Sequence, residues 1–289
     1  MTTETIIHRW VTTVSLQLPS LKNNTADAER LLEALASKIG GRPVHADLHL
    51  IDQLPGLLRQ TGFRLRVVLF EDRGRWLLLA AEDPAIEARV LGLAVDLGTT
   101  RVTLRLVDLA SGNALGEETF DNPQTAVGPD ILTRIHHAAD PAGRRQLQDL
   151  IVDGLNQAVG RICHRFGLDP QRIFMLSLAG NTAMTHLFLG LNPYWMIREP
   201  YIPAVNRPPV MRTAAIGLNL HPAARMLIFP NVGSYFGGDL IAGILFSGLH
   251  KRAETAILVD VGTNAEVVLG NRDWLMACAG AAGNCGMDN

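Results

Sequence analysis

Apolar runs alternate with short polar turns along most of the chain, and their period separates helices from strands. Apolar positions three and four residues apart predict a helix capped by Asn24 and ending at Ile39, and a longer one from Asp140–Pro141 to Phe166, closed by Gly167. Short apolar runs between turn residues predict strands such as "LGLAVD", "RVTLRLVDL" and "RIFMLSLAG". This alternation is typical of an α/β fold.

The pattern changes near residue 90, which suggests a domain boundary. Residues 1–90 contain the first helix, a short helix in "DQLPGLLRQTG" and strands in "TTVSLQLP" and "FRLRVVLFEDRGRWLLLAA", without a catalytic constellation. We interpret them as a small α+β linker or docking domain. Residues 91–289 read as β-hairpin, helices, strand–helix, helix and a second β-hairpin. We therefore expect two lobes on a common plan, lobe one over 91–250 and the start of lobe two over 251–289.

Composition excludes several classes of protein. The 289 residues are 47% hydrophobic and 19% charged, which provides for a sizeable core. A net charge of -2 does not point to nucleic acid or to an anionic membrane. The N-terminus does not read as a signal peptide, and the most apolar region is interrupted by Pro230 and Asp239, so we expect a cytoplasmic protein without membrane spans. The three cysteines form no Cys-x-x-Cys pair.

The motif Asp-x-Gly-Thr occurs twice, in "DLGTT" from Asp96 and in "DVGTN" from Asp260, each time between two expected strands. Gly98 allows a ligand to approach the backbone closely, and with Thr99 and Thr100 it provides a run of N–H donors that suits a phosphate. A carboxylate beside a phosphate requires a cation, so Asp96 and Asp260 predict Mg²⁺. The second copy has the equivalent residues Gly262, Thr263 and Asn264.

These paired hairpins, with "GGDLIAGIL" before the second, resemble the actin, sugar-kinase and heat-shock-chaperone ATPase superfamily. The segments "NPQTAVGPDILTRI" and "LAGNTAMTHLFLGLNP" narrow the resemblance to ATP-dependent reductive activators of corrinoid proteins. It extends from about Leu18 to Cys278. It implies an α/β fold with ribonuclease-H-like lobes that close on Mg-ATP, preceded by the small α+β domain.

The resemblance also implies a function. ATP hydrolysis would drive one electron onto an inactive Co(II) corrinoid protein, and the Co(I) product would support methyl transfer. The implied cofactors are ATP and Mg²⁺. The implied partners are a corrinoid protein or corrinoid-dependent methyltransferase, an electron donor protein and a second copy of the chain. In the family the electron enters through an N-terminal [2Fe–2S] domain, whose Cys-x₄-Cys-x₂-Cys ligands are not in this sequence. We also expect an incomplete second lobe, because "ACAGAAGNCGMDN" departs from the family pattern.

Carried onto this sequence, the resemblance makes Asp96, Asp260 and Asp130 the candidate catalytic residues, with the first two at the metal. Asp130, in a first helical turn, either orients water or only stabilises the helix start. Glu266 either reaches the site or faces solvent. Residues 180–182 match the family's strand–turn–helix turn. Two rival functions stay open: a docking module without turnover, and a small-molecule kinase of the same superfamily.

Overall fold

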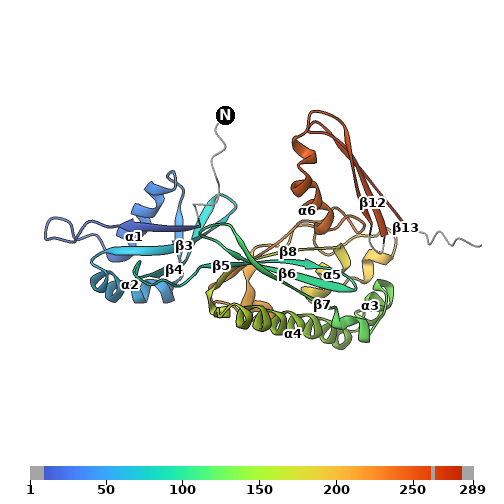
Figure 1. Ribbon diagram of the computed structural model, residues 1–289, viewed down its shortest axis with the longest axis horizontal. Coiled ribbons are helices and arrows are strands. Elements are labelled where there is room, and N and C mark those ends of the chain that lie inside the picture. Colours follow the sequence, from blue (N-terminus) through green and yellow to red (C-terminus); the bar gives the residue numbers. More distant parts are fainter. Residues whose placement is uncertain (1–9, 262–263, 282–289) are drawn as a thin grey trace, which may run out of the picture.

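The structure, a computed structural model, describes residues 10–261 and 264–281 and contains three β-sheets. Figure 1 shows the three sheets as successive parts of one elongated molecule, with the third sheet rising from one end. Among the residues described, no helix is both long and apolar enough to cross a bilayer.

The first sheet has four strands in the order β1-β3-β4-β2. The strands and the two helices packed against them are β1 (Val11–Ser15), α1 (Asp27–Lys38), β2 (Val44–Ala46), α2 (Leu48–Gln60), β3 (Arg64–Asp72) and β4 (Arg75–Glu82). Leu31 and Leu35 of α1 and Leu54 and Leu58 of α2 are almost fully buried in one apolar cluster with the sheet. Their spacing of four residues forms one helix face, so burial of that face holds the helices on the sheet.

The second sheet has six strands in the order β7-β6-β5-β8-β10-β9. Its strands are β5 (Leu91–Leu97), β6 (Arg101–Asp108), β7 (Ala114–Asp121), β8 (Ile173–Gly180), β9 (Met211–Arg212) and β10 (Arg225–Ile228). Its α-helices are α3 (Ile131–His137), α4 (Pro141–Arg165) and α5 (Thr182–Phe188). Single 3₁₀ turns are η2 (Pro123–Ala126), η3 (Pro170–Arg172), η4 (Tyr194–Ile197), η5 (Thr213–Ile216) and η6 (Leu249–Lys251). Strands β5, β8 and β10 run parallel, so their carboxyl ends meet at one edge.

The two ends of helix α4 are determined by local residues. Asp140 caps it by accepting a hydrogen bond from the Gly143 N–H, and Pro141 occupies the first turn. Gly167 follows the end with φ +61°, a conformation that glycine adopts without steric cost. The buried face of α4 packs on the second sheet (Figure 1). The expected limits of this helix are therefore confirmed.

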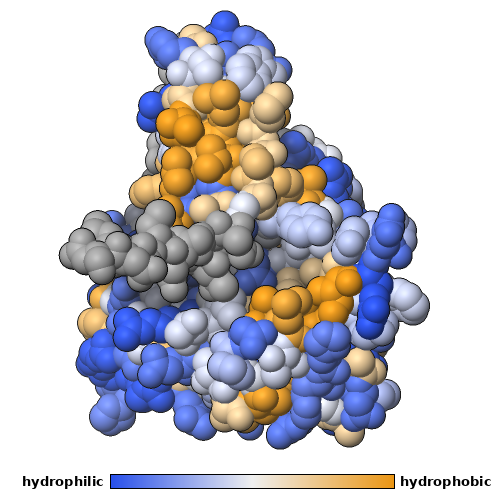
Figure 2. Space-filling view, turned by 90° about the vertical axis from the view of Figure 1, so that its right-hand side faces the viewer, coloured by the Kyte–Doolittle hydropathy of each residue, from blue (hydrophilic) through white to orange (hydrophobic). Residues whose placement is uncertain are grey.

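The third sheet, in the order β11-β12-β13, lies with α6 (Gly238–Ser247) at the far end of the molecule. Its strands are β11 (Ala256–Val261), β12 (Asn264–Gly270) and β13 (Leu275–Ala281). Helix α6 covers one face of this sheet, where its Leu240 and Ile244 pack in one apolar cluster with Val268 of β12. Apolar side chains are exposed elsewhere on this part, among them those of Val261 and Met276, and Figure 2 shows a hydrophobic area there.

Two expectations about the first helices were wrong in detail. Helix α1 begins at Asp27 after Ala26, and Asn24 does not cap it. The preceding segment instead forms a turn whose carbonyl groups accept hydrogen bonds from the buried Arg30 side chain. Helix α2 begins before the expected short segment, because burial of Leu54 and Leu58 stabilises a longer helix despite Pro55.

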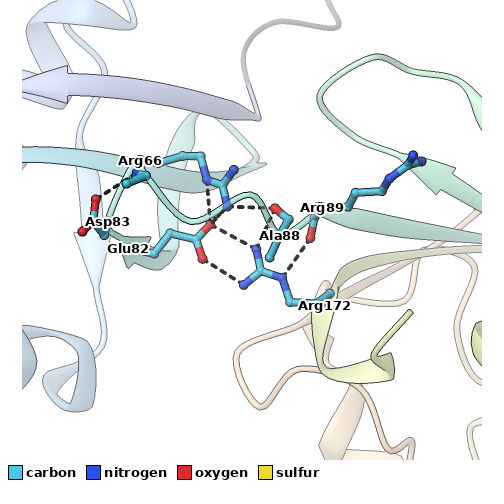
Figure 3. A network of polar contacts seen from close by, with 7 residues as sticks. Arg66, Glu82, Asp83, Ala88, Arg89 and Arg172 are labelled. Atoms are coloured by element: carbon cyan, nitrogen blue, oxygen red, sulfur yellow. Dashed lines mark hydrogen bonds and ion pairs between the residues drawn. The ribbon is translucent and has the colours of Figure 1, made fainter. Parts of the chain in front are cut away.

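The first and second sheets share an apolar core, made of Val68, Phe70, Leu79, Val90, Leu109, Phe174 and Met175. Beside it, Glu82 at the end of β4 accepts hydrogen bonds from Arg66 of the same sheet and from Arg172 near β8 (Figure 3). Apolar burial and a charged network thus hold the two sheets in one arrangement.

Candidate functional site

The candidate site lies where β5, β8 and β10 end. Open α/β sheets bind ligands beside the carboxyl ends of parallel strands, because the loops that follow converge there. After β5 comes the turn 98–100, after β8 the turn at Asn181, and after β10 the loop that leads to α6. The first Asp-x-Gly-Thr motif and the segment 180–182 therefore share one edge of the sheet.

The turn 98–100 is closely packed. A Cβ at Gly98 would lie 2.3 Å from the Arg101 carbonyl oxygen, so only glycine fits the turn as built. The side chain of Asn181 caps α5 and also donates to the Thr99 hydroxyl, with 3.1 Å between Nδ2 and Oγ1. This hydrogen bond joins the turn after β5 to the turn after β8, so the two segments form one surface.

Beside the turns after β5 and β8, the start of α6 forms the third part of the site, and it packs directly on the backbone of the turn after β8. A Cβ at Gly237 would lie 2.4 Å from the Cα of Asn181 and 2.7 Å from the carbonyl oxygen of Gly180. A Cβ at Gly238 would lie 2.7 Å from the Cβ of Phe229. Both glycines are therefore required for close packing, which brings the next residue, Asp239, to the site.

We expect Gly237→Ala to lower the free energy of unfolding by about 2 kcal/mol, because the added methyl group meets backbone that cannot move freely. Urea unfolding measures the change. Gly243→Ala is the matched control in the same helix. Its Cβ would lie 3.6 Å from Leu258, an ordinary contact, so this change should be neutral or stabilising. Equal losses in the two variants would contradict the packing argument.

Four carboxylates gather at the site, and we call them the acidic cluster: Asp96, Asp239, Asp260 and Glu266. Asp96 lies on β5 one residue before its end, and Asp239 lies in the first turn of α6. Asp260 on β11 pairs directly with Glu266 on β12. Like charges directly opposite each other destabilise a sheet, so this pairing has a cost that folding alone does not explain.

The charges of the cluster act on one another. Burial and the charge of Asp260 raise the pKa of Asp96. Burial raises the pKa of Asp239, and the charges of Asp260 and Asp96 add to the effect, against a hydrogen bond from the Leu240 N–H. Burial, Asp239 and Asp260 raise the pKa of Glu266 to about 7. Asp96 as a residue is exposed to water, so its neighbours crowd its carboxylate without enclosing it.

This arrangement fits a divalent cation. Repulsion among carboxylates falls when a cation lies between them, and oxygen ligands are those that Mg²⁺ prefers. Within residues 10–261 and 264–281, no group of three or more His, Cys, Asp or Glu residues is already close enough to hold a metal ion. The cluster therefore suits Mg²⁺ held through water or together with a phosphate ligand, which is how Mg²⁺ is usually bound.

The structure brings some of the sequence candidates together and leaves others apart. Asp96 on β5 and Asp260 on β11 lie close enough for the charge of Asp260 to raise the pKa of Asp96. Asp130 caps α3, where both carboxylate oxygens accept hydrogen bonds from Thr133, and it adds nothing to the raised pKa values of the cluster. Residues 262 and 263 lie outside the described residues, and Asn264 is the first residue of β12.

Sequence reasoning missed one member of the cluster and left another open. Asp239 was noted only as an interruption of an apolar run, although an acidic residue in the first turn of an apolar helix was the available signal. Glu266 had two possible orientations, and the structure buries it at 9% exposure beside Asp260. Its position opposite Asp260 follows from the register of the hairpin, which the sequence leaves undetermined.

Comparison with family models matches nearly the whole chain in three successive parts. Residues 8–86 match the model of the RACo linker region, and residues 91–252 match that of the RACo middle region. Residues 254–285 match the C-terminal domain of RACo, described as the ASKHA domain.

Individual proteins show the same similarity. A solved reductive activator for a corrinoid, iron–sulfur protein superposes with a TM-score of 0.89 and 34% identity over 94% of this chain and 44% of its own. This match confirms the expected mixed α/β, actin-like ATPase fold. The corrinoid activation enzyme RamQ of Eubacterium limosum is 29% identical over 198 residues, which are 68% of this chain and 33% of that protein.

A further relative, the [Co(II) methylated amine-specific corrinoid protein] reductase of Methanosarcina barkeri, is 23% identical over 206 residues. The match covers 66% of this chain and 36% of that reductase. The chain therefore spans about a third of the length of the two curated relatives that it matches.

Proposed function

Because this chain belongs to the RACo family, we propose that it acts in the ATP-dependent reductive activation of a corrinoid protein, from Co(II) to Co(I). The observation that carries the proposal is the convergence of Asp96 and Asp260, one from each Asp-x-Gly-Thr motif, on one acidic cluster, where the charge of Asp260 raises the pKa of Asp96. The names of its relatives, a corrinoid activation enzyme and a Co(II) corrinoid protein reductase, support the choice of substrate.

We assign roles to the residues of this chain as follows. Asp96 and Asp260 would hold Mg²⁺, directly or through water, and the turn 98–100 would bind phosphate oxygens through its N–H groups. Asp239 and Glu266 would orient water in the same shell. Bound Mg-ATP would supply the free energy of phosphoanhydride hydrolysis. These assignments agree with the raised pKa values, since a cation favours ionised carboxylates.

The electron would come from a donor protein and pass to the cobalt of the corrinoid partner, one electron for each Co(II) reduced. We also propose that residues 1–90 are a linker or docking domain and residues 91–289 the ATPase-like part. Besides the core that they share, the first and second sheets each have a larger apolar cluster of their own, and this supports that division.

The test of the activity is direct. The protein is mixed with a Co(II) corrinoid protein, Mg-ATP and a reductant, and the absorbance of Co(I) is followed. We expect ATP to accelerate reduction. If no donor gives an ATP-dependent acceleration, the activity is excluded. Transfer of the γ-phosphate to a sugar or an acid instead of water would show a small-molecule kinase.

We expect Asp96→Asn and Asp260→Asn each to weaken Mg-ATP binding at least about tenfold, since each removes a charged ligand of the cation. Neither change should lower the melting temperature, because each also relieves repulsion within the cluster. Calorimetry and thermal unfolding measure the two effects.

Asp153→Asn, on the exposed side of α4, is the matched control and should alter neither quantity. Parallel losses of binding and melting temperature would mark Asp96 and Asp260 as structural. Absence of nucleotide binding in the unmodified protein would favour a docking module.

A further inference from the structure

Two buried side chains hold the turn 98–100 from behind. Asn122 Nδ2 donates to the carbonyl oxygen of Gly98 over 2.9 Å. The backbone N–H of Asn122 donates to the carbonyl oxygen of Thr100 over 2.7 Å. Arg134 Nη1 donates to the carbonyl oxygen between them, on Thr99, over 2.8 Å. Both Asn122 and Arg134 have no exposed surface. The carbonyl groups of Gly98, Thr99 and Thr100 are therefore held by hydrogen bonds on the buried side of the turn.

Fixing these carbonyl groups also aims the N–H groups. In a trans peptide the N–H points away from the carbonyl oxygen of the preceding residue. The N–H groups of Thr99 and Thr100 therefore point away from Asn122 and Arg134. Neither N–H donates to any residue that the structure describes. Within the described part of the chain, two adjacent donors therefore lack an acceptor on the side of the turn opposite Asn122 and Arg134, an arrangement that binds anions.

Burial of the Arg134 guanidinium costs free energy that a purely structural role does not require. Its Nε donates to the Gly128 carbonyl oxygen over 2.8 Å, and its Nη2 is buried without a hydrogen-bond partner among the described residues. No ion pair within 4.0 Å joins it to a carboxylate of the described part of the chain. Burial lowers its pKa, although the charge of Asp130 acts in the opposite direction. A well-packed apolar residue would stabilise such a position at lower cost.

We propose that Asn122 and Arg134 are positioning residues for a phosphate group, which they do not touch. They orient the N–H groups of Thr99 and Thr100 toward it, and the guanidinium of Arg134 adds positive potential behind the turn. This role rests on the proposed function, since it requires a polyphosphate ligand at the turn. It also explains why a buried cation donates to the turn, because positive charge behind the turn attracts an anionic ligand.

The test uses two variants and a matched control. Arg134→Lys keeps the charge but cannot reach both the Gly128 and Thr99 oxygens with a planar fork. Asn122→Ser keeps a side-chain oxygen that can accept from the Gln124 N–H, but it lacks the amide N–H group that donates to Gly98. Arg225→Lys is the control, because Arg225 is also buried and donates to the backbone oxygen of Ala223, away from the turn.

Hydrogen exchange of segment 97–103, without ligand, should be faster in both variants and unchanged in the control. Calorimetry with Mg²⁺ and inorganic tripolyphosphate, and with Mg-ATP, should show about a tenfold loss of affinity in both variants, equivalent to about 1.4 kcal/mol. Unchanged exchange in the turn, or an equal loss of affinity in Arg225→Lys, would overturn the positioning role.

Failure of the proposed function has a different signature. An unmodified protein that binds neither tripolyphosphate nor Mg-ATP would overturn nucleotide binding itself. The ligand-free exchange rates would then decide alone whether Asn122 and Arg134 hold the turn.

Discussion

Replacing Glu82 by glutamine is expected to lower the free energy of unfolding by about 3 kcal/mol. Glu82 is 9% exposed and accepts hydrogen bonds from Arg66 Nε over 2.8 Å and from Arg172 Nη1 over 2.8 Å. Without the carboxylate, two guanidinium groups would face each other at the junction of the first and second sheets (Figure 3). Removal of one partner from a buried ion pair leaves uncompensated charge, which costs more than the pair contributes.

The pH dependence of the free energy of unfolding provides a second measure of the Arg66–Glu82–Arg172 network. Burial alone would raise the pKa of Glu82, but hydrogen bonds and charges of Arg172 and Arg66 outweigh burial and hold it below the ordinary value. A carboxylate with a lowered pKa contributes stability above its unfolded-state pKa and loses it as the pH falls through the folded-state value. The acid-side loss of stability should therefore be smaller in Glu82→Gln than in the unmodified protein.

Urea unfolding between pH 3 and 7 measures both effects. Glu117→Gln is the matched control, because Glu117 pairs with Arg105 on the exposed side of β6 and β7. Exposed pairs contribute between about 0 and 1 kcal/mol, so the control should change little. A loss in Glu82→Gln no larger than that of Glu117→Gln would show that the network does not hold the two sheets together.

Glu266→Gln is expected to act in the opposite direction and stabilise the protein above pH 7 by about 2 kcal/mol. Burial, Asp239 and Asp260 raise the pKa of Glu266 from 4.5 to about 7. A carboxyl group with a raised pKa favours the folded state fully only below its unfolded-state pKa. That contribution is lost as the pH rises from about 4.5 through 7, and the upper limit of the loss is about 3 kcal/mol.

The variant cannot ionise, so this fall should be missing from its stability profile between pH 4.5 and 8. Chemical unfolding across that range, without Mg²⁺, measures the difference. Glu254→Gln, at an exposed position just before β11, is the matched control and should keep the profile of the unmodified protein. If Glu266→Gln retained the same slope, Glu266 would not carry the buried charge assigned to it.

Gain of stability should accompany loss of ligand binding in this variant. Glu266 faces the same cluster as Asp239 and Asp260, and a bound cation would lower its pKa. Calorimetry at pH 8 should therefore show weaker Mg-ATP binding in Glu266→Gln. Such opposed effects are expected where a site stores unfavourable charge for a ligand.

Much of the fold could be predicted from local signals alone. The cap at Asp140, the first-turn Pro141 and Gly167 mark helix α4, and alternating apolar runs mark the strands of the second sheet. The two Asp-x-Gly-Thr motifs, at Asp96 and Asp260, were found by residue type and spacing. These features depend on contacts within a few residues, so the residue order is enough to specify them.

The remaining features depend on segments far apart in the chain. The N-cap of α1 was mispredicted because the buried side chain of Arg30 holds the preceding turn, and Asp239 was missed because Gly237 must first pack on Asn181. The buried Arg134 has no signal of its own, since its partner Thr99 lies 35 residues away. Burial, hairpin register and mutual repulsion of charges exist only once the sheets are packed, and they decide which carboxylates form the site.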